Sequence, residues 1–307
     1  MGDSDWFWSF VDVRRSFRGV VDPVLGWRMA SDAGRGPLNV VGGHRVSYQP
    51  SGPTVTVWWF GGSTMFGLVQ RDDHTIPSEV ARLAERDGIR IRSVNFGVEG
   101  YNAMQEALAF GLALGGDRGS AAPPDLAVFY DGANELATAV ERVDVGRTDP
   151  DDVYFQAVSE DERAARGTSR RTAALSPDER TALTVDLGAA QYRRAAAIVT
   201  DLARGADVPV VHLWQPLLAT TARQGFEAPL LDVLDVDPDG LSQVRSVYDR
   251  MRSSSGVDPV DLSDAMTGAT GPTFFDFEHT NERGARIVAR RIYAAIRSTL
   301  VAQSERR

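Results

Sequence analysis

The run TVTVWWF at Thr54–Phe60, followed by Gly61-Gly62-Ser63, decides the fold. Every residue of this run is β-branched or aromatic, which is typical of a strand buried on both faces. The two glycines then allow a tight turn from the strand into a helix. The sequence therefore predicts a central strand with a serine at its carboxyl end.

Similar strands alternate with helices along the rest of the chain. Further strands are predicted at Arg90–Asn95, Asp125–Tyr130, Val208–Trp214 and Val257–Leu262. Apolar residues at helical spacing predict helices at Thr75–Arg86, Tyr101–Leu114, Leu183–Arg204, Leu241–Arg252 and Asn281–Val301. Because strands that alternate with helices form a parallel sheet covered on both faces, we predict an α/β fold.

Two stretches depart from this alternation. Residues 1–50 are rich in turn residues and are predicted to form an N-terminal extension packed on the domain. Residues 138–180 are polar, charged and weakly periodic, and indicate an insertion or lid. No internal repeat or linker divides the remainder, so residues 51–307 are predicted to form one domain.

Composition excludes several classes of function. The chain has 307 residues, 43% of them hydrophobic, a formal net charge of −9, and only arginine among its 33 basic residues. An acidic chain without a basic stripe is not expected to bind nucleic acid. The absence of cysteine excludes disulfides, thiolate catalysis and thiolate metal ligands.

The first residues give no sign of a targeting segment. Acidic residues interrupt Met1–Val20, so neither a signal peptide nor a membrane span is predicted, and the expected location is the cytoplasm, with secretion left open. The aromatic residues of this segment are expected to dock on the domain.

Polar or glycine-rich turns follow the predicted strands. Ser63 follows the first strand, Gly100 the second and Asn134 the third, while Asp276 and His279 lie just before the last helix. Since the carboxyl ends of parallel strands share one edge of the sheet, these turns are expected to converge. A serine activated by a histidine, which a carboxylate orients, is the machinery of acyl transfer. Ser63, Asp276 and His279 are therefore the candidate catalytic residues.

The same chemistry needs donors for a tetrahedral oxyanion. The candidates are the Ser63 N–H, the Gly100 N–H and the Asn134 amide, with Gly97 as a competitor for the glycine position. No metal ligand set is predicted. His212 lies in a buried-strand pattern and is predicted to be a core residue with its hydrogen bonds satisfied.

These turns resemble the signature blocks of the SGNH hydrolases, the GDSL-like esterase/lipase superfamily. Ser63, Gly100, Asn134, Asp276 and His279 match the family pattern in identity and order over roughly residues 54–302. The resemblance implies a flavodoxin-like catalytic domain at 51–307, a three-layer α/β/α sandwich with a central parallel sheet of about five strands. It also implies cofactor-free hydrolysis of carboxylic esters through an acyl-enzyme. Two departures are that Gly62 replaces the usual aspartate and that a glutamate follows Asn134.

Other readings of the same residues stay open. Ser63 could be an ordinary helix cap and Asn134 an Asx-turn residue. An acyltransferase would use the same acyl-enzyme, and a catalytically silent binding protein could keep the fold. A nucleotide site is excluded, because a P-loop needs a lysine and a dinucleotide site needs an acid after the second strand.

The substrate is expected to be a small-molecule, sugar or natural-product ester, and the oligomeric state is left open. One alternative holds that arginines of the insertion bind an anionic substrate. These arginines are Arg142, Arg147, Arg163, Arg166, Arg170 and Arg171.

Overall fold

Five parallel strands form the centre of the structure, a computed structural model that describes residues 19–33, 36–116, 122–155, 174–221, 228–234 and 238–306. Their order across the sheet is β10-β9-β8-β6-β7, and every neighbouring pair among them is parallel. The predicted parallel sheet is confirmed. The bounds are Val55–Gly61 for β6, Ile91–Asn95 for β7, Leu126–Asp131 for β8, Val210–Trp214 for β9 and Val260–Asp261 for β10.

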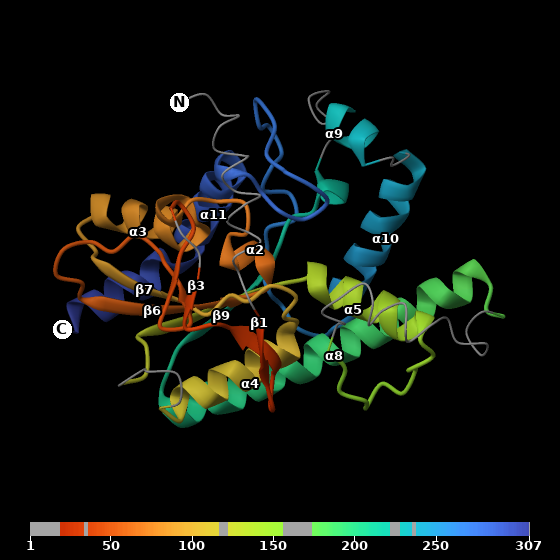
Figure 1. Ribbon diagram of the computed structural model, residues 1–307, viewed down its shortest axis with the longest axis horizontal. Coiled ribbons are helices and arrows are strands. Elements are labelled where there is room, and N and C mark those ends of the chain that lie inside the picture. Colours follow the sequence, from red (N-terminus) through yellow and green to blue (C-terminus); the bar gives the residue numbers. More distant parts are fainter. Residues whose placement is uncertain are drawn as a thin grey trace.

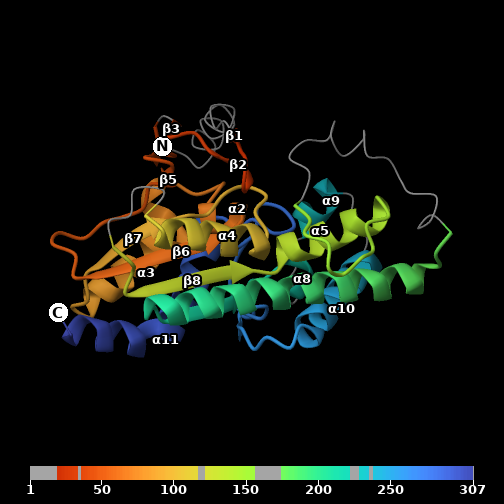
Figure 2. The ribbon, with the colours of Figure 1, turned by 90° about the horizontal axis from the view of Figure 1, so that it is seen from below.

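Helices cover both faces of this sheet (Figures 1 and 2). Side chains alternate between the faces of a strand, so Val57 and Trp59 of β6 pack in one hydrophobic cluster and Trp58 and Phe60 in the other. The first cluster includes residues of α3 (Ile76–Arg86) and α11 (Glu282–Glu305), and the second includes residues of α4 (Ala103–Leu114) and α8 (Pro177–Ala206). The predicted three-layer sandwich is thus confirmed.

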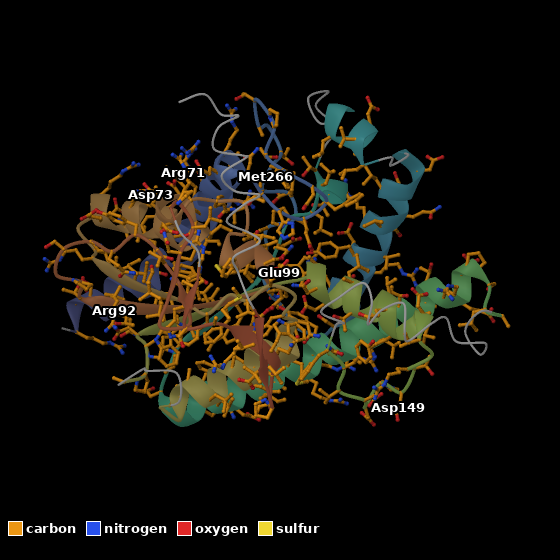
Figure 3. All side chains as sticks on the ribbon, in the orientation of Figure 1. Arg71, Asp73, Arg92, Glu99, Asp149 and Met266 are labelled. Carbon is orange, nitrogen blue, oxygen red and sulfur yellow. The ribbon has the colours of Figure 1, made fainter. Side chains whose placement is uncertain are left out.

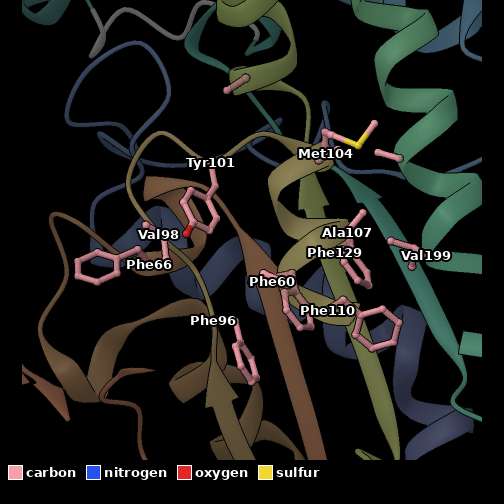
Figure 4. Packing of buried hydrophobic residues seen from close by; sticks show 14 of the residues in the cluster. Phe60, Phe66, Phe96, Val98, Tyr101, Met104, Ala107, Phe110, Phe129 and Val199 are labelled. Carbon is pink, nitrogen blue, oxygen red and sulfur yellow. The ribbon is translucent and has the colours of Figure 1, made fainter. Parts of the chain in front are cut away.

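A row of phenylalanine rings joins the three central strands (Figure 4). Phe60 of β6 stacks between Phe96 and Phe129, with ring centroids 4.8 Å apart on each side. Phe110 of α4 meets Phe60 and Phe129 edge-on, at 5.5 Å from each. This packing fixes the ends of β6, β7 and β8 relative to one another, just where the candidate turns begin.

Helix boundaries differ from the predictions mainly around the proposed insertion. Helix α5 (Ala133–Asp144) begins directly after β8 and was not predicted, and α8 begins at Pro177. Both ends of the stretch 138–180 are therefore helical, and residues 156–173 lie outside the described part. The other helical elements are α2 (Ser63–Phe66), η1 (Asp72–His74), η2 (Leu218–Thr220), α9 (Ala228–Val233) and α10 (Pro238–Ser254).

None of the helices in the described residues is long and apolar enough to cross a membrane.

His212 on β9 differs from its prediction, because its hydrogen bonds are not satisfied within the described part of the chain. Neither ring nitrogen has a hydrogen-bond partner among the described residues. Burial between Phe129 and Tyr192 lowers the pKa of His212 to about 4, so its ring is a neutral packing group.

The N-terminal extension contributes strands that the sequence did not predict. Strands β3 (Asp32–Ala33), β4 (Val40–Val41) and β5 (His44–Arg45) are antiparallel to one another and join the sheet where Arg45 pairs with Asn95 of β7. The buried Arg45 side chain also forms an ion pair with Asp72. The edge of the parallel sheet is therefore covered by residues from the extension.

A separate hairpin packs against the turn after β7. Strands β1 (Gly19–Asp22) and β2 (Gly26–Met29) form it, and the Trp27 Nε1 group donates to the Glu99 carbonyl at 2.9 Å. The Tyr101 hydroxyl donates to the Trp27 carbonyl, and the Gln105 amide donates to the Leu25 carbonyl at 2.8 Å. The hairpin thus holds the segment that contains Gly100. The aromatic residues of 1–18 that were expected to dock lie outside the described residues.

Candidate active site

The candidate serine stands where the central strand turns into a short helix. Ser63 is the first residue of α2, and its N-cap is Gly62, which makes no side-chain capping bond. The structure therefore excludes the reading of Ser63 as an ordinary helix cap. Only 4% of the Ser63 surface is exposed, so the turn leaves the hydroxyl largely covered.

Glycine is required at two of the turns because other elements approach so closely. A Cβ atom on Gly62 would lie 1.9 Å from the Asn134 Nδ2 atom and 3.0 Å from the Tyr101 carbonyl oxygen. Gly132, just before α5, has a φ of 128° and would place a Cβ 2.0 Å from the Tyr248 hydroxyl. The turns after β6, β7 and β8 therefore meet at Gly62, and this position accepts no side chain.

Ser63, His279 and Asp276 form one chain of hydrogen bonds. The Ser63 Oγ atom lies 2.7 Å from His279 Nε2, and His279 Nδ1 lies 2.7 Å from Asp276 Oδ2. An ionised Asp276 can only accept, so Nδ1 carries the ring proton and Nε2 accepts the proton of the Ser63 hydroxyl. This tautomer is the one in which histidine can remove a proton from serine.

Asp276 is itself held in place by the turn. Its Oδ1 atom accepts the backbone N–H groups of Glu278, at 3.0 Å, and His279, at 2.8 Å. Burial opposes ionisation of Asp276, but the hydrogen bonds and charge of His279 outweigh it and keep the pKa of Asp276 below its usual value. The carboxylate therefore remains charged and points Oδ2 at the imidazole.

The charges around His279 favour its protonated form. Burial lowers the pKa of His279, but the hydrogen bond that its ring donates to Asp276 and the charges of Glu278, Asp276 and Glu99 raise it overall. The ring is buried, with 11% of its side chain exposed. A base whose pKa is raised by carboxylates accepts a proton more readily and stabilises the imidazolium that results.

Asn134 and the Gly100 turn lie against the same serine turn. The Asn134 Nδ2 group donates to the Tyr101 carbonyl at 2.7 Å, which fixes the amide beside Gly62 and leaves its second N–H for another acceptor. Gly100 has a φ of 78°, and its N–H has no acceptor among the described residues. Gly97 instead packs against α2, because a Cβ there would lie 2.5 Å from the Phe66 nitrogen. This position of Gly97 under α2 favours Gly100 as the oxyanion donor.

Sequence reasoning missed three buried carboxyl groups beneath this turn: Glu106, Asp131 and Glu135. Glu135 accepts the N–H of Ala103 at 2.7 Å and also the N–H of Gly132, and it thereby ties the start of α4 to the start of α5. The glutamate that departs from the family pattern after Asn134 therefore braces two of the converging turns. A lone acid in the apolar run of α4 was the available signal for Glu106.

Glu106 and Asp131 share a hydrogen bond, so at least one of them carries a proton. Burial and the neighbouring carboxylates raise the pKa of Glu106 well above its usual value, and burial and Glu135 do the same for Asp131. Because the folded protein holds these protons more tightly than the unfolded chain, their contribution to stability is complete at acidic pH. It is lost as the pH rises through the raised pKa values.

Glu106→Gln is expected to stabilise the protein at alkaline pH, because the amide donates to Asp131 without needing a proton. The melting temperature, followed by circular dichroism, should rise by a few degrees relative to wild type at pH 9 and change little at pH 5. Glu305→Gln, an exposed glutamate at the end of α11, is the matched control and should show no such pH dependence. An equal effect of Glu106→Gln at both pH values would contradict the assignment.

The two described arginines of the group proposed to bind an anionic substrate are engaged within the protein. Arg142 is fully buried and donates to Gln191 at 3.1 Å, and Arg147 forms an ion pair with Asp152 at 2.7 Å. Arg163, Arg166, Arg170 and Arg171 lie outside the described residues. In the described ranges, no group of three or more histidine and carboxylate side chains could hold a metal ion.

The fold and the site together have the arrangement of a serine hydrolase: a nucleophile turn after a parallel strand, an Asp-His pair before the last helix, and an asparagine amide beside the nucleophile. No family model matches the sequence, and neither does any curated protein.

Solved structures resemble the chain at low identity. An acetyl xylan esterase, AlAXEase, is 12% identical over 79% of this chain and 100% of its own, with a TM-score of 0.45. The lipase/acylhydrolase from Enterococcus faecalis is 14% identical over 80% of this chain and 96% of its own, with a TM-score of 0.44. A member of the lipolytic protein G-D-S-L family from Veillonella parvula is 12% identical over 79% and 98%, also at 0.44.

Proposed function

We propose that this protein is a serine esterase of the SGNH hydrolase type, which hydrolyses carboxylic esters through an acyl-enzyme on Ser63. The observation that carries the proposal is the unbroken hydrogen-bond chain from Ser63 Oγ through His279 to Asp276, with 2.7 Å at each step. Serine alone is a weak nucleophile, and this chain supplies the base that activates it.

In the first half of the reaction, Ser63 Oγ attacks the ester carbonyl carbon while its proton passes to His279 Nε2. The carbonyl oxygen becomes an oxyanion, which the free N–H of the Asn134 amide and the N–H groups of Ser63 and Gly100 stabilise. The carbon–oxygen bond to the alcohol then breaks, and His279 gives its proton to the departing oxygen. Asp276 keeps its charge throughout and stabilises the transient imidazolium.

In the second half, water takes the position of the departed alcohol. His279 removes a proton from the water, the hydroxide attacks the acyl carbon, and the bond to Ser63 Oγ breaks as Nε2 returns the proton to the serine. The products are the carboxylic acid and the free enzyme. An alcohol acceptor in place of water would give acyl transfer from the same intermediate.

A fluorophosphonate probe tests the nucleophile directly. The expected result is a covalent adduct on Ser63 in the folded protein and none after denaturation or in Ser63→Ala. An intact folded protein that gives no adduct would favour a silent binding protein on this fold. Product analysis with and without an added alcohol then separates hydrolysis from acyl transfer.

Asn134→Ala is expected to lower kcat on short p-nitrophenyl esters by about 10²–10³-fold with little change in KM, because it removes one oxyanion donor. Asn134→Asp keeps the shape of the side chain but cannot donate when ionised, so it should lose a similar factor. A loss near twofold in both variants would remove Asn134 from the mechanism.

A further inference from the structure

Glu278 brings a second carboxylate to the histidine that activates Ser63. Its Oε1 atom lies 3.8 Å from His279 Nε2, the same ring nitrogen that Ser63 Oγ approaches at 2.7 Å. Asp276 instead approaches the opposite nitrogen, Nδ1. Since both oxygens stand close to one atom, the Glu278 carboxylate is within a few bond lengths of any ester attached to Ser63.

The position beside Nε2 identifies the part of the ester that Glu278 faces. In the reaction proposed above, Nε2 delivers its proton to the oxygen of the departing alcohol. Groups that surround Nε2 therefore surround the alcohol portion, whereas the acyl oxygen lies toward Asn134. Glu278 is placed to contact substituents of the alcohol.

Within the part of the chain that the structure describes, no arginine lies within ion-pair distance of Glu278. Among the described residues, His279 is the one basic side chain within ion-pair distance of this carboxylate, and its ring also serves Asp276 and Ser63, at 2.7 Å from each. The side chain is 29% exposed, so water hydrates it only in part. A partly desolvated, unbalanced charge costs free energy that a bound cation would recover.

Nearby charges add to the negative field at this position. Burial raises the pKa of Glu278, and the charges of Asp276 and the exposed Glu99 add to that rise. The charge of Glu99, beside the Gly100 turn, also raises the pKa of His279, so its carboxylate acts on the same region. In the view of Figure 3, Glu99 lies near α2 and the start of α5, where the candidate turns converge. An anionic alcohol would be repelled here and a cationic one attracted.

We propose that Glu278 is a specificity-determining residue that makes the site prefer esters whose alcohol portion carries a positive charge, such as an ammonium group. The inference rests on the ester hydrolysis proposed above, because that reaction assigns the alcohol to the Nε2 side.

Two esters of matched shape test this preference: 2-(trimethylammonio)ethyl acetate, which is cationic, and 3,3-dimethylbutyl acetate, which is neutral. Binding of each to the Ser63→Ala protein is measured by calorimetry, so the result does not require turnover. We expect the cationic ester to bind roughly 5- to 10-fold more tightly, as for a partly screened ion pair. The preference should disappear in Ser63→Ala with Glu278→Gln.

Ser63→Ala with Asp201→Asn is the matched control for net charge, because Asp201 is an exposed acid on α8 paired with Arg204. This control should keep the preference. A rise in salt should weaken binding of the cationic ester and leave the neutral one unchanged, which tests the charge effect without altering Glu278. Equal binding of the two esters, or a preference that survives Glu278→Gln, would overturn the inference.

Turnover by the wild-type protein separates this inference from the proposed function. Hydrolysis of both esters that depends on Ser63, with equal kcat/KM, would refute the selectivity and leave the esterase intact. Tighter binding of the cationic ester without any fluorophosphonate adduct on Ser63 would refute the esterase and retain a site for cationic ligands.

Discussion

Ser63→Ala is expected to lower kcat on short p-nitrophenyl esters by at least about 10⁴-fold, because it removes the atom that forms the acyl-enzyme. The same change should leave the free energy of unfolding within about 1 kcal/mol of wild type, because the hydroxyl makes one side-chain hydrogen bond, to His279. Initial rates and urea unfolding measure the two quantities.

Ser47→Ala is the matched control for this substitution. Ser47 is also buried and its hydroxyl contacts Thr75 at 3.4 Å, away from His279. We expect its rate to stay close to wild type. Residual turnover in Ser63→Ala within tenfold of wild type would mean that another group attacks the ester.

Asp276→Asn is expected to lower kcat by about 10³–10⁴-fold while the local backbone stays in place. The carbonyl oxygen of the new amide must stay at the Oδ1 position, where the N–H groups of Glu278 and His279 need an acceptor. The amide nitrogen then occupies the Oδ2 position and donates to His279 Nδ1. This donation forces the proton onto Nε2, which can no longer accept the proton of Ser63.

Asp22→Asn provides a close comparison, because the Asp22 Oδ1 atom also accepts two backbone N–H groups, those of Val24 and Leu25. It lies in the N-terminal hairpin and contacts no imidazole, so its activity should remain near wild type. The ring protons of His279, observed by NMR in Asp276→Asn, would report the tautomer. A proton that remained on Nδ1 would contradict this explanation.

The parallel sheet and the order of the site residues could be read from the sequence because both depend on local signals. The composition of the TVTVWWF run is enough by itself to predict a strand. Asp276 and His279 lie three residues apart on a single turn. Their contact with Ser63 could be expected only from the rule that parallel strands end at one edge.

Structural features that form only through contacts between residues far apart in the sequence could not be predicted from local sequence patterns. Strands β3 to β5 have two residues each, and only pairing with one another and with β7 makes them strands. The hydrogen bond between Glu106 and Asp131 joins a helix to a strand end. The lone acid in the apolar run of α4 marks Glu106 as unusual, but nothing local to it indicates Asp131 as its partner. Helix α5 was missed because its polar residues resemble those of the insertion that follows.

The contacts of the first fifty residues decide where the chain can be shortened. The Trp27 side chain donates to the Glu99 carbonyl, and the Leu25 carbonyl accepts from Gln105. Arg45 pairs with β7 through its backbone and forms an ion pair with Asp72. A shorter chain that began at residue 51 would contain the nucleophile, the base and the acid, but it would lack the wall against which the Gly100 turn rests. It would also expose the unpaired edge of β7, whose free N–H and C=O groups could pair with a strand of another copy. The smallest active form of this protein is therefore expected to include the hairpin and the strands that precede β6.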